Sequence, residues 1–239
     1  MAYFDGFVVP VPATNKEEYL KNARDAVPLF QEFGMTRMVE AWGDDVPDGE
    51  VTDFKGAVQA KDDEVVVFSW CEYPDRETRN AAGEKMMSDP RMDNMVMAFD
   101  GKRMIYGGFE PLLDQGTPGR GEYADGFILP VPEGNRDAYR ALAEKAAAIF
   151  QEFGATRVVE AWGDQVPDGK QTDFRKAAKA EDGENIVFSF IEWPSKQVRD
   201  EAWQKVMGDE RMKPDGEMPF DGKRMFWGGF KPILDTARD

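Results

Sequence analysis

The chain has 239 residues, of which 46 are acidic and 30 basic, and its formal net charge is −16. A field of that sign repels phosphate groups, which excludes nucleic acid and anionic membrane surfaces as partners. The sequence holds no histidine and one cysteine, which excludes histidine-based acid–base catalysis, Ser–His and Cys–His pairs, histidine-ligated haem, His-bearing zinc sites and an internal disulfide. We therefore expect no cofactor and no metal.

Four strands and two helices are predicted in the first half of the chain. Residues 3–11 alternate and are rich in β-branched and aromatic side chains, as a strand is. Asn15 and Glu18 form a capping-box pattern that begins a helix, and Gly34 ends it. Asp75 caps a second helix. The remaining predicted strands are residues 35–44, 65–73 and 103–113, and residues 52–60 are either a loop or a short helical turn.

The second half of the chain repeats the first. DGFVVPVP at 5–12 matches DGFILPVP at 125–132, and EAWGDDVPDG at 40–49 matches EAWGDQVPDG at 160–169. The offset is 120 up to Arg91 and becomes 121 at the two FDGKRM segments, so one residue is inserted between them. A constant register over a whole unit indicates a duplicated domain. We predict a first repeat at residues 1–113, a Gly- and Pro-rich linker at 114–122, and a second repeat at 123–239.

The order of elements predicts the fold. Each repeat reads β-α-β-β-α-β, which is the ferredoxin-like unit with two helices on one face of an antiparallel sheet. Packing the two bare sheet faces together covers both, so we expect an α+β protein in which two ferredoxin-like repeats form a pseudo-dimeric α/β barrel. The repeats thereby make an internal pseudo-dimer, and both a monomer and a higher oligomer stay open. A cytoplasmic protein is expected, because no apolar run spans a bilayer and no segment resembles a signal peptide.

The repeated EAWGD segment supplies candidate ligand-binding residues. Strand alternation places Glu40, Trp42 and Asp44 on one face, and does the same for their counterparts Glu160, Trp162 and Asp164. A buried carboxylate beside tryptophan would have a raised pKa and could transfer protons. The alternative is a strand glutamate paired with Arg or Lys. An oxygen-ligand metal site formed with Asp48 matches no known loop spacing and is not predicted.

Two arginines and several aromatic residues complete the candidates. Arg103 and Arg224 follow the FDGK turns, where each could hold a ligand carboxylate or phosphate, or pair with Glu40 or Asp44. The paired glycines of the GGF segments indicate a bulge or a close backbone approach. We expect the tryptophans of EAWGD to anchor the core between the repeats. The other strand aromatics and the single cysteine are predicted in the core: Trp70, Phe109, Phe190, Phe230 and Cys71.

Several motifs resemble a known bacterial family. DGFVVPVP, EAWGDDVPDG, VVFSW followed by YP, DPR, and FDGKRM with GGF are similar, in that order, to the YbaA-like family of unknown function (DUF1428), whose members usually carry one such unit. The resemblance implies a dimeric α/β-barrel fold and assigns no catalytic residue. Related barrels include haem enzymes, cofactor-free oxygenases, isomerases and binding modules, so the fold alone does not select a function.

Three functions are compatible with these features. The leading hypothesis is a protein that binds a small polar or anionic organic molecule. The second is a cofactor-independent enzyme, an isomerase or an oxygenase, in which Glu40 and Glu160 transfer protons while Arg103 and Arg224 hold the substrate anion. The third is a structural or partner-binding module. A pocket that contains both Glu and Arg favours the first two, and a barrel filled with side chains favours the third.

Overall fold

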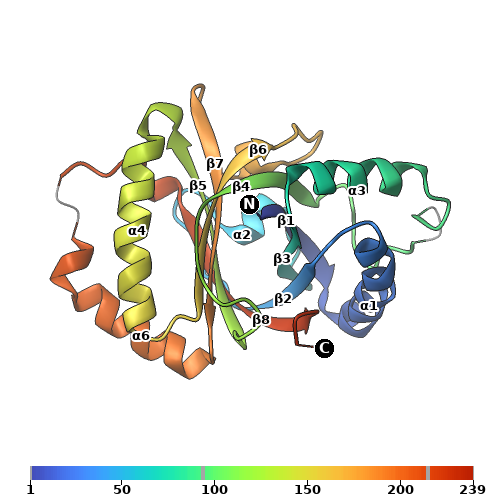
Figure 1. Ribbon diagram of the computed structural model, residues 1–239, viewed down its shortest axis with the longest axis horizontal. Coiled ribbons are helices and arrows are strands. Elements are labelled where there is room, and N and C mark those ends of the chain that lie inside the picture. The colour runs from blue at the N-terminus through green and yellow to red at the C-terminus, as the bar shows by residue number, and fades with distance from the viewer. Residues whose placement is uncertain (1, 93–94, 214–215, 239) are drawn as a thin grey trace.

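The computed structural model describes residues 2–92, 95–213 and 216–238 and contains one closed antiparallel barrel (Figure 1). Going round the barrel, the strands follow the order β1-β3-β2-β8-β5-β7-β6-β4. Their bounds are β1 Tyr3–Pro12, β2 Arg37–Asp45, β3 Glu64–Tyr73, β4 Ile105–Gly116, β5 Tyr123–Pro132, β6 Arg157–Gln165, β7 Glu184–Trp193 and β8 Phe226–Asp235.

The barrel is built from two ferredoxin-like sheets joined along both edges. Within each repeat the strands take the order 4-1-3-2, as β4-β1-β3-β2 and β8-β5-β7-β6. The edge strand β2 then pairs with β8, and β4 pairs with β6, with register shifts at both seams. Because β4 runs on to Gly116, it extends into the segment expected to be the linker. The predicted α+β pseudo-dimeric barrel is confirmed, and hydrogen bonding between the repeats removes every free sheet edge from it.

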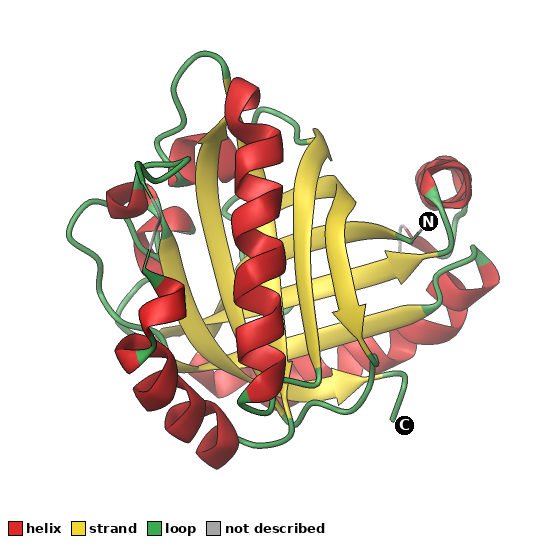
Figure 2. Cartoon of the chain, turned by 60° about the vertical axis from the view of Figure 1, so that its left-hand side comes forward, coloured by secondary structure: helices red, strands yellow, loops and turns green. Residues whose placement is uncertain are grey.

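Four long helices cover the outside of the barrel (Figure 2). In Figure 1, α1 (Lys16–Glu32) and α3 (Arg76–Ser88) lie on the side opposite α4 (Arg136–Glu152) and α6 (Lys196–Gly208). The side chain of Asp75 caps α3 as predicted, by accepting from Thr78 N. The predicted capping box at Asn15 is wrong: its side chain makes no cap hydrogen bond and donates instead to the carbonyl of Ala98.

Two short helices close one end of the barrel. They are α2 (Phe54–Ala57) and α5 (Phe174–Ala177), and the first confirms the short helical turn considered for residues 52–60. The ring of Phe54 packs edge-on against Phe68, Phe226 and Phe230. Each short helix also accepts a threonine hydroxyl from the other repeat, as when Thr172 donates to the Ala57 carbonyl.

The barrel interior is filled by aromatic side chains from both repeats, as predicted for these strands. Phe68 stacks on its counterpart Phe188 with centroids 4.6 Å apart, and Trp70 stacks on Phe190 at 4.2 Å. This contact explains the glycine of the DGF motif, because a Cβ at Gly6 would lie 2.5 Å from the Phe188 ring. The repeats therefore meet at a packed core with no room for a ligand between the stacked rings.

Buried charges close the opposite end of the barrel. Arg37 pairs with Asp235 at 2.9 Å and with Glu192 at 2.7 Å. Its counterpart Arg157 pairs with Asp114 at 2.8 Å and with Glu72 at 2.7 Å. Because both guanidiniums bind acids from both repeats, this network ties the two halves together. Removing one partner would leave an uncompensated buried charge.

Candidate functional site

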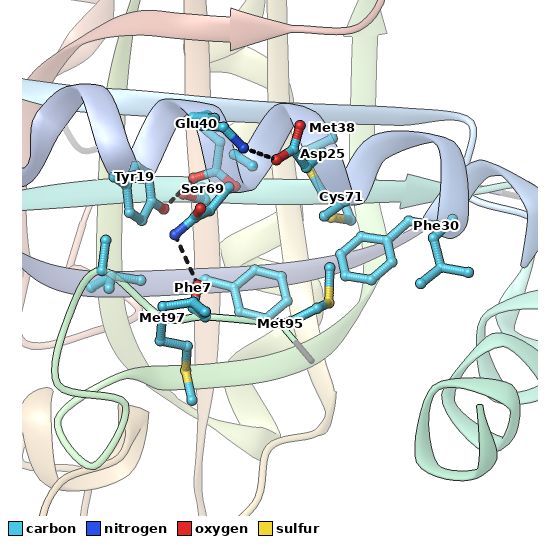
Figure 3. Close-up of a pocket in the computed structure, with 18 of the residues that line it drawn as sticks. Phe7, Tyr19, Asp25, Phe30, Met38, Glu40, Ser69, Cys71, Met95 and Met97 are labelled. Carbon is cyan, nitrogen blue, oxygen red and sulfur yellow. Dashed lines mark hydrogen bonds and ion pairs between the residues drawn. The ribbon is translucent and has the colours of Figure 1, made fainter. Parts of the chain in front are cut away.

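The candidate site is a pocket of about 730 Å³ on the outer face of the first repeat. It lies between α1 and the outward-facing side chains of β1, β2 and β3, and residues 95–99 form part of its wall (Figure 3). Most of the lining is apolar, from side chains such as Phe7, Phe30, Met38 and Met104. The pocket therefore lies outside the barrel core, under the first helix.

Glu40 is the carboxylate in the deep part of this pocket. Its neighbours on β2, Val39 and Ala41, belong to the barrel interior, so alternation turns Glu40 outward beneath α1. The Tyr19 hydroxyl of α1 donates to Glu40 Oε2 at 2.5 Å, and the Ser69 hydroxyl of β3 donates to the same oxygen (Figure 3). Burial raises the pKa of Glu40, and the two hydroxyl hydrogen bonds act in the opposite direction.

The second carboxylate oxygen of Glu40 is available to a ligand. Among the described residues, both hydrogen bonds to the Glu40 side chain end on Oε2, and Oε1 accepts none. The described part of the chain also contains no buried side-chain polar atom without a partner. Oε1 therefore retains accessible surface, and the pocket that Glu40 lines is the space it faces. This oxygen can accept a hydrogen bond or exchange a proton with a bound molecule.

The second repeat carries the same three side chains. Tyr139 donates to Glu160 Oε2 at 2.6 Å, and Ser189 hydrogen bonds to the same carboxyl group. Burial raises the pKa of Glu160 to about 7, while the hydrogen bonds from Tyr139 and Ser189 lower it. Sequence analysis selected both glutamates and missed the tyrosine and the serine that hydrogen bond to each of them. The missed signal was a serine that interrupts the same apolar strand in both copies, as VVFSW and IVFSF.

The predicted role of Trp42 and Trp162 in the core between the repeats is wrong. Both share a face with the glutamates, as expected, but that face lies outside the barrel. Trp42 is half-buried in a cluster with Val9 and Tyr19, and Lys16 lies 5.0 Å from its ring centroid. Trp162 lies in the outer cluster of the second repeat, with Arg136 5.5 Å from its ring centroid. Instead, the small side chains of these two strands face the barrel interior.

Arg103 and Arg224 form ion pairs away from the glutamates. Arg103 binds both carboxylate oxygens of Glu64 at 2.6 Å and contacts Asp100 at 3.0 Å. Arg224 repeats the arrangement with Glu184 at 2.7 Å and with Asp221 at 3.0 Å. The ion-pair interpretation is confirmed, but the partners are not Glu40 or Asp44. Each arginine thereby joins the first residue of the third strand of its repeat to the turn before the fourth strand.

Asp44 and Asp164 contact the opposite repeat. Asp44 accepts from the Tyr123 hydroxyl at 2.8 Å and pairs with Lys196 at 3.0 Å. Asp164 accepts from the Tyr3 hydroxyl at 2.9 Å and pairs with Arg76 at 3.0 Å. These contacts join the repeats at the strand edges.

Of the eight candidate residues, Glu40 alone belongs to the pocket lining. Cys71, also in the lining, is buried as predicted, and burial raises its thiol pKa well above the ordinary value. Within residues 2–92, 95–213 and 216–238, no group of three His, Cys, Asp or Glu side chains is arranged to hold a metal ion.

A family profile described as "Protein of unknown function (DUF1428)" matches residues 2–101 and again residues 122–222. The chain belongs to this family. Uncharacterized protein YbaA of Escherichia coli K12 is 62% identical over 115 residues, which cover 48% of this chain and 98% of YbaA. The YbaA protein of Shigella flexneri matches to the same extent. The chain is thus a tandem form of a unit that stands singly in YbaA.

Solved structures show the same fold in distant proteins. A proposed monooxygenase of Fusobacterium nucleatum superposes with a TM-score of 0.62 at 8% identity, over 98% of this chain and 93% of that one. A proposed monooxygenase of Lactobacillus acidophilus superposes with a TM-score of 0.56 at 10% identity, over 98% and 95% of the two chains. At these identities the likeness establishes the fold alone. Among the helices of the described residues, none has the length and apolar character needed to cross a membrane.

Proposed function

We propose that the first repeat binds a small organic molecule that has an apolar body and one polar group, in the pocket beneath α1. The observation that carries the proposal is Glu40 Oε1, an unpartnered oxygen that lies in a mainly apolar pocket of about 730 Å³. A concave apolar site with one polar anchor is the usual form of a small-molecule site. Lining side chains such as Phe7, Phe30 and Met38 would cover the apolar body of the ligand.

The burial of Glu40 bears on which polar group fits. Burial favours the neutral carboxylic acid, which can donate a hydrogen bond from Oε1 while Oε2 continues to accept from Tyr19 and Ser69. A neutral acid can donate to a carbonyl or to an anionic oxygen, which agrees with a polar or anionic ligand. Because the pocket lining is mainly apolar, the ligand should also have an apolar body.

The probe for this proposal is 8-anilinonaphthalene-1-sulfonate, an aromatic anion that becomes fluorescent in apolar sites. Ala26 of α1 lines the pocket and Ala146 is its counterpart in the second repeat. We expect one equivalent of probe to bind the wild-type chain, Ala26→Phe to abolish this binding by filling the pocket, and the matched Ala146→Phe to preserve it. Equal binding by the two variants would contradict the proposal, because the probe would then lie elsewhere.

A second candidate function is cofactor-free proton transfer by Glu40. The supporting observations are its raised pKa and its Oε1, which faces the pocket. The carboxylate would take a proton from a carbon next to a carbonyl, leaving an enolate, and the carboxylic acid would return a proton to the same molecule, so that no other reactant is needed. The proposed monooxygenases with this fold support an enzyme of this general architecture and transfer no residue.

Exchange of the carbon-bound protons of 2-tetralone in deuterated water tests this candidate. General base catalysis typically contributes about 10²–10⁴-fold, so Glu40→Gln should slow the protein-catalysed exchange by at least about 100-fold. The matched Glu160→Gln variant should exchange like wild type. Exchange that is unchanged in Glu40→Gln would exclude Glu40 as the base and leave the binding proposal intact.

A further inference from the structure

Trp203 of α6 packs, in the second repeat, against the counterparts of two residues that line the pocket. Its indole ring lies 5.2 Å from Phe150 and 6.2 Å from Phe127, measured between ring centroids. The counterparts of these two phenylalanines are Phe30 and Phe7, and both line the pocket of the first repeat. An aromatic bicycle from the chain itself therefore packs against the second-repeat copies of two pocket walls.

The counterpart residue in the first repeat has no side chain. The counterpart of Trp203 is Gly83 of α3, and a Cβ at Gly83 would meet no atom within 4 Å. Glycine is also among the least favourable residues for a helix interior. The space next to Gly83, where Trp203 begins its side chain in the other repeat, is therefore open.

A carboxylate marks the same place in both repeats. The indole N–H of Trp203 donates to Asp125 Oδ2 at 2.8 Å, while Arg199 donates to Oδ1. In the first repeat, Arg79 likewise donates to Asp5 Oδ1 at 2.8 Å. Within the described residues, Asp5 Oδ2 accepts no hydrogen bond. An acceptor oxygen is therefore unpartnered at the position where the second repeat binds an indole N–H.

We infer that the first repeat binds a planar bicyclic aromatic molecule that carries a ring N–H or hydroxyl donor in the open space beside Gly83, which would adjoin the pocket at Phe7 and Phe30. The ring would lie against Phe7 and Phe30 and the donor would bind Asp5 Oδ2, with Trp203 as the chain's own counterpart of this ligand in the second repeat. The inference rests on the proposed function and names its ligand class. The second repeat would accordingly hold a latent copy of the same site.

Indole and benzofuran test the inference on the wild-type protein. The two molecules have nearly the same shape, and only indole has a ring N–H. Burial raises the pKa of Asp5 to about 6, so equilibrium dialysis at pH 8 keeps its carboxylate ionised. We expect one indole per chain, bound at least about tenfold more tightly than benzofuran, because a hydrogen bond to a charged group is lost with benzofuran. Equal affinities, or no binding of indole, would overturn the inference.

Reciprocal variants locate the bound ring. Gly83→Trp should abolish indole binding by closing the first site, and Trp203→Gly should raise the stoichiometry from one indole per chain to two. Asp5→Asn should lower the affinity for indole to that for benzofuran and leave benzofuran unchanged. Circular dichroism and thermal melting establish that each variant is folded. If Trp203→Gly does not fold, Gly83→Trp and Asp5→Asn decide the question alone.

Failure of the inference is distinguishable from failure of the proposed function. If 8-anilinonaphthalene-1-sulfonate binds the wild-type chain and Ala26→Phe abolishes this binding, the pocket is a binding site whether or not indole binds. If indole binds a folded Gly83→Trp variant as it binds wild type, the ring does not lie at the Trp203-like place, and the inference is wrong while the proposed function stands.

Discussion

The barrel interior joins the two repeats, whereas their helix-covered outer faces differ at Gly83 and Trp203. Inside the barrel, aromatic side chains of one repeat pack on those of the other, as Phe68 does on Phe188 and Trp70 does on Phe190, so a change in one copy must fit the other. Outside, α6 places an indole where α3 has glycine. The shared core thus couples the two copies, and the place where they have diverged lies under the outer helices.

The largest expected effect tests the equivalence of the inner faces. Phe68→Ala and Phe188→Ala each remove a fully buried stacked ring, and each should lower the free energy of unfolding by about 3–5 kcal/mol. Urea denaturation of the single and double variants measures both costs and their coupling. Costs that differ by more than about 2 kcal/mol would show that the inner faces are not energetically equivalent.

A somewhat smaller effect tests the divergence of the outer faces. Trp203→Ala removes ring contacts with Phe150 and Phe127 and should cost about 2–4 kcal/mol. The matched Gly83→Ala fills open space in a helix and should stabilise the protein by about 0.5–1 kcal/mol. Chemical denaturation gives both signs. If Trp203→Ala unfolds like wild type, the indole does not stabilise the second repeat.

The pH dependence of stability sharpens the comparison at the glutamates. The folded-state pKa of Glu160 is raised to about 7 from an ordinary value of 4.5, so the folded protein binds this proton more tightly than the unfolded chain does. The contribution of this proton to the free energy of unfolding is therefore largest at low pH. It is lost as the pH rises through 7, and the total loss is up to about 3 kcal/mol. Unfolding of wild type and Glu160→Gln between pH 5 and pH 8 measures it. A difference between the two that stays constant with pH would contradict the raised pKa.

The smallest expected effect concerns the one position at which EAWGDDVPDG and EAWGDQVPDG differ. Asp45 pairs with Arg199 at 2.9 Å, and its counterpart Gln165 accepts from Arg79. Asp45→Gln makes the first repeat resemble the second and should cost no more than about 1 kcal/mol, because the carboxylate is partly exposed to solvent. The cost should shrink further in high salt. A loss of several kcal/mol in thermal melts would show that this ion pair holds the repeats together.

Much of the fold followed from the sequence, and the candidate site followed only in part. The repeat and the order of the elements predicted the ferredoxin-like units, and alternation correctly placed Glu40 and Trp42 on one face. Alternation has no preference between the two faces of a strand, so it could not show that this face lies under a helix. Tyr19 lies within the first predicted helix, and nothing local connected it with Glu40.

The sequence alone determined the duplication, the succession of strands and helices, and the set of side chains that share each strand face, because these depend on residues a few positions apart. The tertiary structure decided which face turns inward, that Glu64 pairs with Arg103, and that Trp203 lies against Phe127. These contacts join residues separated by tens of positions or more, and local periodicity carries no information about such distances. The pocket beneath α1 is one of these outcomes, since it exists only where a helix, three strands and a returning loop meet.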